Sequence, residues 1–214
     1  MARVERLCQT KLNERNLFKA VNEHAISLVN YYIGILKLEP DDYAMLDNEI
    51  RTILTKYKIH FQPSCKERLY LPRTEMGRGL CSVEHRSEQI LLQLRMQLEK
   101  DRHTSIRRAS IFSVGKKIWT YLALIVPYLS NKYNINQQDL EIIKLINAQK
   151  TNLYNKIKHK YLHSKLYKCA ENELVDLKGS SIWLKKDNIK VMGKSVLCFL
   201  QDRNLFYEKK VNCP

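Results

Sequence analysis

Two adjacent carboxylates, Asp41 and Asp42, are the first residues in the chain that suggest an active site. Two-metal phosphoryl transfer uses carboxylates that are held close together over the metal ions. Here the pair follows Pro40, and proline is typical of the first turn of a helix, where acidic residues are stabilised by the helix dipole. No apolar strand pattern flanks the pair. The sequence therefore predicts that these acids open a helix, and it predicts no catalytic residue.

Histidines offer a candidate metal site. His159 and His163 are four residues apart, a spacing that places both on one face of a helix. A zinc site needs at least a third protein ligand, for which Cys169 is a candidate. The pair has no HExxH glutamate and lies among lysines. We therefore expect no metal and no cofactor in this chain.

Glycines offer a candidate phosphate site in the stretch RLYLPRTEMGRGL (68–80), where Gly77 and Gly79 flank Arg78. Glycine permits a positive φ angle, and Pro72 favours an extended approach, so the stretch suits a structural turn. Backbone N–H groups of the same turn can instead face a phosphate, although neither the Walker A nor the dinucleotide-loop pattern is present. On the residues alone, both interpretations stay open.

The chain as a whole is strongly basic. Its 214 residues include 37 Lys and Arg against 22 Asp and Glu, a net charge of +15. This excess indicates a polyanionic partner, with nucleic acid first and an anionic membrane surface second. Between Ile142 and Ala170 the chain has seven lysines and no acid. Interleaved tyrosines in that region suit contacts to sugar, base or backbone, and a solvated helix face is the alternative.

Other features of the composition bear on the compartment. The longest apolar run, residues 118–129, is too short to span a bilayer and is interrupted by Pro127. The N-terminus is charged at once and does not resemble a secretory signal. The six cysteines form no CxxC pair, which predicts free thiols rather than a disulfide framework or a zinc finger. We therefore expect an intracellular protein.

Six glycines and five prolines, with apolar residues spaced three and four apart, predict a mainly α-helical fold with little or no sheet. Residues 58–81 form an irregular connection, and the polar stretch 101–110 predicts a boundary near residue 105. We expect a helical domain over residues 1–100 and a basic helical region over residues 105–214. The expected helices cover residues 13–37, 40–57, 82–100, 112–131, 136–163, 180–187 and 191–204. The first has one apolar stripe that runs from Leu17 to Ile35 and includes Leu28 and Tyr32, the second has a core face that includes Tyr43, Ile50 and Leu54, and Ser82 is the candidate cap of the third.

The stretch LTKYKIHFQPSCKERLYLPRTEMGRGL (54–80) resembles the thumb region of reverse transcriptases from non-LTR (LINE-type) retrotransposons, which commonly carry a pattern like LTKH..HHPKS..ERLYLPRKEGGRGL. Upstream, KLNERNLFKAVN (11–22) is similar to the family's KLNGKNLVKAIN. Downstream, residues 162–206 are similar to a stretch that contains AAQDQ. The resemblance covers most of the chain, and its most specific part is ERLYLPR..GRGL. Met76 stands where the family often has glycine.

This resemblance implies a thumb-like helical bundle that grips an RNA–DNA hybrid behind a catalytic palm, followed by a linker toward a Cys/His finger and an endonuclease. The palm motifs are not among these residues. We therefore expect a fragment of an RNA-directed DNA polymerase that is not an enzyme by itself, whereas the parent enzyme would use Mg²⁺. Two other hypotheses are a free-standing helical RNA- or DNA-binding protein captured from such an element, and an interaction scaffold that binds no nucleic acid.

The implied partners are RNA, DNA or an RNA–DNA hybrid, and the implied location is nuclear. We expect no membrane partner and no small-molecule substrate. Pro72, Gly77 and Gly79 are expected to shape the structural turn. The residues expected to bind nucleic acid are Lys66, Arg68, Arg73, Arg78, Lys156, Lys158, Lys160 and Lys165.

Overall fold

The structure is a computed structural model that describes residues 1–33, 38, 40–62, 64–100, 121–160, 163, 176, 179, 181–185 and 189–203. Within these ranges the fold is mainly helical and contains no strand, which confirms the predicted fold class. The expected boundary near residue 105 lies outside the described residues. None of the helices described is both long enough and apolar enough to cross a membrane.

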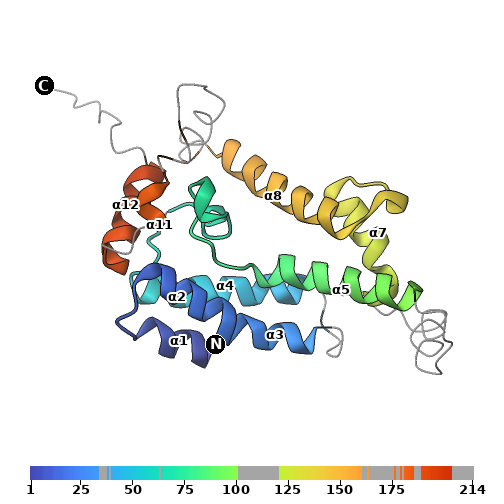
Figure 1. The fold of residues 1–214 in the computed structure, drawn as a ribbon, viewed down its shortest axis with the longest axis horizontal. Coiled ribbons are helices and arrows are strands. Elements are labelled where there is room, and N and C mark those ends of the chain that lie inside the picture. The colour runs from blue at the N-terminus through green and yellow to red at the C-terminus, as the bar shows by residue number, and fades with distance from the viewer. Residues whose placement is uncertain are drawn as a thin grey trace, which may run out of the picture. The chain divides into compact units, whose positions relative to one another are not determined.

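The chain forms two compact units, and neither is continuous in sequence. Unit 1 comprises Met1–His24, Ile50–Leu80 and Leu153–Pro214, and unit 2 comprises Ala25–Glu49 and Cys81–Asn152. These bounds differ from the expected division at residues 100 to 105. Helices α4 (Pro40–Lys56) and α8 (Ile142–Lys158) each contribute residues to both units (Figure 1).

Unit 1 begins with helices α1 (Ala2–Cys8) and α2 (Glu14–Val21), which pack against each other (Figure 1). The Asn13 side chain caps α2 by accepting a hydrogen bond from the Asn16 backbone N–H at 2.9 Å. The apolar face of α2 is buried and includes Leu17 and Phe18. Two further helices of this unit come from much later in the sequence, α11 (Ile182–Lys185) and α12 (Val191–Arg203).

The single helix expected over residues 13–37 is interrupted. Helix α2 is followed by a π-helical turn, η1 (Asn22–Ile26), and then by α3 (Ser27–Tyr32), while residues 34–37 lie outside the described part. A π turn contains more residues than an α turn, so it rotates the side chains that follow. One continuous apolar stripe, predicted for an uninterrupted helix, is therefore wrong, because two of its members, Leu28 and Tyr32, are exposed on α3.

Unit 2 contains α3, α5 (Val83–Lys100), α7 (Tyr121–Tyr133) and the first part of α8. Ser82 caps α5 as predicted, since its Oγ accepts a hydrogen bond from the His85 N–H at 3.2 Å. Asp47 on α4 strengthens this start by accepting bonds from the Ser82 hydroxyl at 2.6 Å and the Val83 N–H at 2.9 Å. A buried carboxylate at a helix N-terminus is well placed for the helix dipole.

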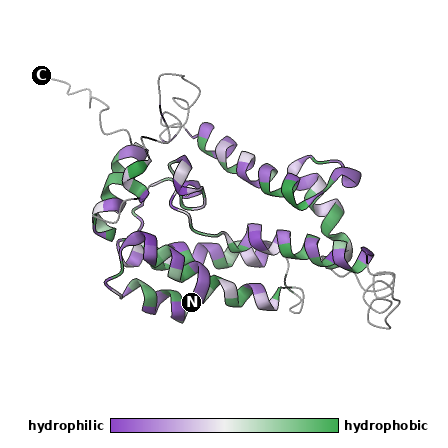
Figure 2. Ribbon diagram, viewed as in Figure 1, coloured by the Kyte–Doolittle hydropathy of each residue, from purple (hydrophilic) through white to green (hydrophobic). Residues whose placement is uncertain are grey.

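Helices α5 and α7 pack side by side in unit 2, and the described helices combine hydrophobic and hydrophilic positions (Figure 2). Between them Glu88 is fully buried and accepts hydrogen bonds from Lys132 at 2.5 Å, Tyr133 at 2.8 Å and Gln149 at 2.7 Å. Burial opposes the charged form of Lys132, but the carboxylates of Glu88 and Glu84 outweigh it and raise the lysine pKa. One lysine thus faces two carboxylates, and burial raises the pKa of Glu88 in spite of Lys132.

Candidate nucleic-acid interface

The stretch RLYLPRTEMGRGL folds into a tight loop of unit 1 with two short 3₁₀ helices, η2 (Glu67–Leu69) and η3 (Arg73–Glu75). The Gly77 N–H donates to the Pro72 carbonyl and the Gly79 N–H donates to the Leu71 carbonyl, both at 3.0 Å. Pro72, Gly77 and Gly79 thus all lie in the turn. Because these N–H groups are bonded within the loop, the phosphate-facing interpretation has no donors at the two glycines.

Glycine is favoured at three positions of this loop for two different physical reasons. Gly79 has a φ of 76° and Met76 has a φ of 62°, both in the left-handed region that favours glycine. Gly77 has no positive φ, but a Cβ atom there would lie 2.0 Å from the Leu71 carbonyl oxygen. The sequence permitted a positive φ on either side of Arg78, and of the two glycines only Gly79 adopts one. Met76 adopts the strained conformation with its side chain buried in the core.

Arg68 lies in the interior of unit 1, where 1% of its surface is exposed. Its Nη1 donates to Asp202 Oδ1 on α12 at 2.8 Å, and its Nε donates to the Met76 carbonyl at 2.7 Å. Gln201 Oε1 accepts a third bond from Nη2 at 2.5 Å. A buried guanidinium requires such partners, because an unpaired charge in the interior is strongly destabilising. Arg68 therefore ties the loop to α12.

Arg78 is buried to the same extent and pairs with the first residue of α2, its Nε lying 3.0 Å from Glu14 Oε1. Its Nη2 donates to the Ile59 carbonyl at 2.6 Å. The guanidinium carbon also lies 5.0 Å from the centroid of the Phe18 ring, in cation–π geometry. Arg78 therefore joins the loop to α2.

Arg73 is only partly buried and lies near the same carboxylate, with its Nη2 3.7 Å from Glu14 Oε1. Its Nη1 donates to the Leu184 carbonyl on α11 at 2.8 Å. The three arginines expected to contact nucleic acid thus bond to protein acceptors, and Arg68 and Arg78 have no surface to offer a ligand. The physical reason is that each buried guanidinium finds a carboxylate from a distant part of the chain.

Burial also changes the titration of neutral groups near the loop. Burial and the charges of Arg78 and Arg51 lower the pKa of His60 to about 3, so this imidazole is neutral at physiological pH. Burial raises the pKa of the Cys65 thiol to about 12, which makes it a poor nucleophile. The four described cysteines are free, as predicted: Cys8, Cys65, Cys81 and Cys198.

The lysines expected to bind nucleic acid differ in exposure from the arginines. Lys66 and Lys156 are exposed to solvent. Lys158 and Lys160 are partly exposed, and Lys165 lies outside the described residues. A lysine head group can remain in water while its stem packs against the protein.

Two of these basic segments meet in unit 1 although they are 93 residues apart, because Lys160 Nζ donates to Glu67 Oε2. Burial would raise the pKa of Glu67, but the hydrogen bond and charge of Lys160, together with hydrogen bonds from the backbone and Cys65, lower that pKa. A hydrophobic cluster beneath the ion pair joins the loop to the end of α8, and its members are Cys65, Leu71, Met76, Leu153 and Ile157. Lys66, on the loop, and Lys156 and Lys160, at and just after the end of α8, are together called the lysine patch, because these contacts hold the two segments against each other.

The positive charge of the chain is concentrated in one unit. The sequence ranges of unit 1 contain 25 Lys and Arg against 11 Asp and Glu, a net charge of +14. Those of unit 2 contain 12 against 11, a net charge of +1. Almost the whole electrostatic attraction for a polyanion thus comes from the unit that carries the lysine patch.

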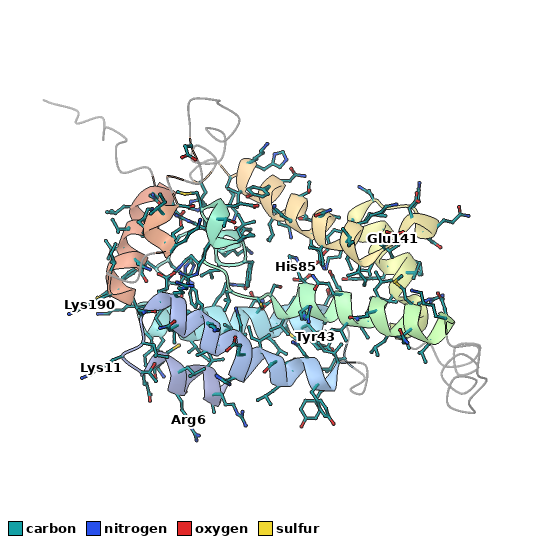
Figure 3. The ribbon with its side chains drawn as sticks, in the orientation of Figure 1. Arg6, Lys11, Tyr43, His85, Glu141 and Lys190 are labelled. Carbon is teal, nitrogen blue, oxygen red and sulfur yellow. The ribbon has the colours of Figure 1, made fainter. Side chains whose placement is uncertain are left out.

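Sequence reasoning missed a groove of about 560 Å³ in unit 1. Residues 10–13, before α2, form one wall, and residues 189–192, at the start of α12, form the other. Lys11 and Lys190 project from this end of the unit (Figure 3). A cation lies on each wall, but the two lysines are 179 positions apart in the sequence, and no local pattern signals that they are neighbours.

The described residues contain no group of three or more potential metal ligands close enough to hold an ion. His159 is exposed after the end of α8, whereas His163 is buried with its Nδ1 3.0 Å from the Asp202 carbonyl oxygen. The two histidines therefore do not share a face of α8, which ends at Lys158. Asp41 and Asp42 lie in the first turn of α4, as predicted.

Comparison with known proteins identifies no relative. No family model matches the sequence, no curated protein matches it significantly, and no solved structure matches the fold significantly.

Proposed function

We propose that the chain binds nucleic acid through unit 1, as the thumb and linker portion of a retrotransposon RNA-directed DNA polymerase. The observation that carries this proposal is the concentration of nearly all the net charge in unit 1. Nucleic-acid phosphates are the natural counterpart of such a surface. In this proposal Lys66 and Lys156 contact the backbone of RNA, DNA or an RNA–DNA hybrid, Lys160 joins the two segments of the patch through Glu67, and the buried arginines hold the surface in shape.

The backbone of the loop supports the resemblance on which the polymerase assignment rests. The family pattern ERLYLPRKEGGRGL has glycine at the positions of Met76, Gly77 and Gly79. In this structure two of those positions have positive φ, and the third has no room for a Cβ atom. The pattern therefore places glycine where this backbone favours it.

A second support comes from the contact between two stretches that carry the resemblance. The ERLYLPR stretch contains Arg68, and the stretch similar to AAQDQ contains Gln201 and Asp202. Arg68 donates hydrogen bonds to both of these side chains. A fold in common with the family, in which these two stretches contact each other, would explain why both stretches occur in one chain.

Binding can be tested by its dependence on salt. The dissociation constant for an RNA–DNA hybrid and for single-stranded RNA would be measured from about 50 to about 200 mM salt. Each lysine that neutralises a phosphate releases counterions, so log K should fall with log salt by about 0.7 to 0.9 per contact. A flat salt dependence, or affinity no greater than that of a polylysine of equal charge, would overturn the proposal and favour the interaction scaffold.

The lysine patch can be separated from net charge with matched variants. In Lys66→Gln/Lys156→Gln two exposed cations of the patch are removed, and in Lys100→Gln/Lys144→Gln two exposed cations of unit 2 are removed. The two variants have equal charge. We expect the first to lower the salt slope by about 1.4 to 1.8 and the second to change it little. Equal losses in the two variants would show that the patch has no special role.

In this proposal the chain supplies grip, while catalysis and Mg²⁺ belong to the complete polymerase, which would act on nuclear DNA. Purified chain mixed with Mg²⁺, nucleotides and a primed RNA template should not extend the primer. Primer extension that survives removal of contaminating polymerases would overturn the binding-only role.

One observation favours the alternative of a free-standing nucleic-acid-binding protein. The buried arginines of unit 1 find their carboxylate partners within the chain, so the unit can complete its core without a palm domain. The two hypotheses differ in what the purified chain does alone. A free-standing protein binds hybrid or RNA tightly by itself, whereas a polymerase portion gains most of its affinity when it is joined to the palm.

A further inference from the structure

The groove between residues 10–13 and 189–192 is lined by both cationic and exposed apolar side chains. Lys11 and Lys190 are both exposed, and neither has an ion-pair partner among the described residues. Apolar side chains accompany the cations, with Leu12 36% exposed and Met192 52% exposed. None of the eight lining residues is acidic. Its volume of about 560 Å³ falls in the range typical of small-ligand sites.

This combination selects for a ligand with both a negative charge and an accessible apolar face. In a duplex the bases are stacked and paired, so the backbone offers only phosphate and sugar to a protein wall. An unpaired nucleotide offers a phosphate together with the face of a base, which packs against apolar side chains. The groove therefore fits an unpaired nucleotide better than a duplex backbone.

We propose that the groove binds an unpaired nucleotide of a single strand, with its phosphate between Lys11 and Lys190 and its base against Leu12 and Met192. This inference rests on the proposed function, because it assigns one position of the bound nucleic acid to a site outside the lysine patch. The charge of unit 1 favours nucleic acid over an acidic peptide as the occupant, because a strand can continue along the same basic unit.

Helix α12 relates the groove to the lysine patch within unit 1. Lys190 precedes the first residue of α12, while Asp202, near the other end, accepts a hydrogen bond from the backbone N–H of Cys65 at 3.0 Å. Twelve residues at 1.5 Å each separate these points by about 18 Å. Even at the duplex rise of about 3.4 Å per nucleotide, which an unstacked strand exceeds, about five steps cover that length. A strand of about six nucleotides is therefore long enough to contact the groove and the patch together.

Methionine methyl groups allow a test at the groove itself. The protein would be labelled with ¹³C at the methionine methyls, and a six-nucleotide oligouridine would be added. We expect a saturable shift of the Met192 resonance, assigned by its loss in Met192→Leu. Met45, which is exposed in unit 2, serves as the internal control and should not move.

A charge variant completes the test. Lys11→Gln/Lys190→Gln should lower the salt slope for the oligouridine by about 1.4, at about 0.7 per lysine, and should abolish the Met192 shift. The equal-charge control Lys100→Gln/Lys144→Gln should keep both. A six-base-pair duplex should shift Met192 less than the single strand does.

The outcomes separate this inference from the proposed function. If no nucleic acid binds at low salt, the proposed function fails and the groove inference fails with it. If the oligouridine binds with a steep salt dependence while the Met192 resonance stays in place, only the groove inference is overturned. It is overturned as well if a hexaglutamate peptide shifts Met192 as strongly as the oligouridine, because the groove would then recognise charge without a base.

Discussion

Replacing Asp202 by alanine should destabilise unit 1 more than any substitution of an exposed charge. The carboxylate accepts hydrogen bonds from Arg68 at 2.8 Å and from the Cys65 backbone N–H at 3.0 Å, and all of these groups are buried. Removing it leaves the Arg68 charge in the interior without a counterion and the N–H without an acceptor.

The expected cost follows from what Arg68 retains. Breaking a buried ion pair costs about 3 to 5 kcal/mol. Arg68 keeps the Met76 carbonyl and Gln201 as acceptors, so the lower end of that range applies. The unsatisfied Cys65 N–H adds about 1 kcal/mol. The variant should therefore lose about 4 kcal/mol of unfolding free energy.

Urea unfolding followed by tryptophan fluorescence would measure this loss. Trp183 lies in α11 of unit 1 and reports on that unit when the second tryptophan is removed by Trp119→Phe. With a slope of about 2 kcal/mol per molar urea, the midpoint should fall by about 2 M. If the single variant does not fold, the double variant Arg68→Met/Asp202→Ala still gives a reading, because it leaves no unpaired charge.

The double variant also supplies the refuting result. An apolar replacement of both partners removes the buried charge, so the double variant should be more stable than Asp202→Ala alone. A control in the exposed pair, Glu23→Ala beside Lys19, should change the midpoint little. The single variant Arg68→Met completes the comparison. If Asp202→Ala costs less than about 1 kcal/mol, or if the double variant loses as much stability as Arg68→Met and Asp202→Ala lose together, the ion pair does not hold unit 1 together.

Three further predictions concern local features. His60 has a folded-state pKa of about 3, below its ordinary 6.5, so the unfolded chain takes up the proton first. Unit 1 should therefore lose up to about 1.4 kcal/mol of stability per pH unit between about pH 6.5 and pH 3, and urea midpoints of His60→Asn should show a shallower pH dependence. Gly77→Ala should cost more than Gly79→Ala, because a Cβ at Gly77 clashes with the rigid Leu71 carbonyl, whereas Gly79→Ala meets a positive φ worth about 1 to 2 kcal/mol and a 3.3 Å approach to the Arg73 side chain, which can shift; thermal unfolding of both variants measures the difference. Asp47→Ala should cost about 1 to 2 kcal/mol and speed amide exchange in the first turn of α5 relative to its last turn.

Local patterns predicted the bounds of α4, α5 and α12 closely, but they missed α1 and placed the helix that is α8 over 136–163 rather than Ile142–Lys158. The spacing of Tyr43, Ile50 and Leu54 indicated the buried face of α4, and all three are buried. Ser82 was identifiable as a cap because capping depends on residues only three positions away. The π turn after α2 was not predictable in this way, since apolar spacings of three and four continue through it.

The roles of the arginines could not be predicted from sequence. A guanidinium followed by glycines suits a phosphate contact and a buried ion pair equally well. What decides is the position of a carboxylate 134 residues away for Arg68 and 64 residues away for Arg78. The groove lysines were missed for the same reason, because tertiary structure alone makes Lys11 and Lys190 neighbours.

The discontinuity of unit 1 also has a consequence for how the protein is made. At about 5 to 20 residues per second, the ribosome needs roughly 6 to 25 s to proceed from Arg78 to Asp202. Arg68 lacks its counterion throughout that interval, whereas the last segment of unit 2, Cys81–Asn152, is completed 50 residues before Asp202. The nascent chain should therefore complete unit 2 first and close unit 1 last. A basic, half-built unit 1 is then the species most open to proteases and to premature contact with cellular RNA.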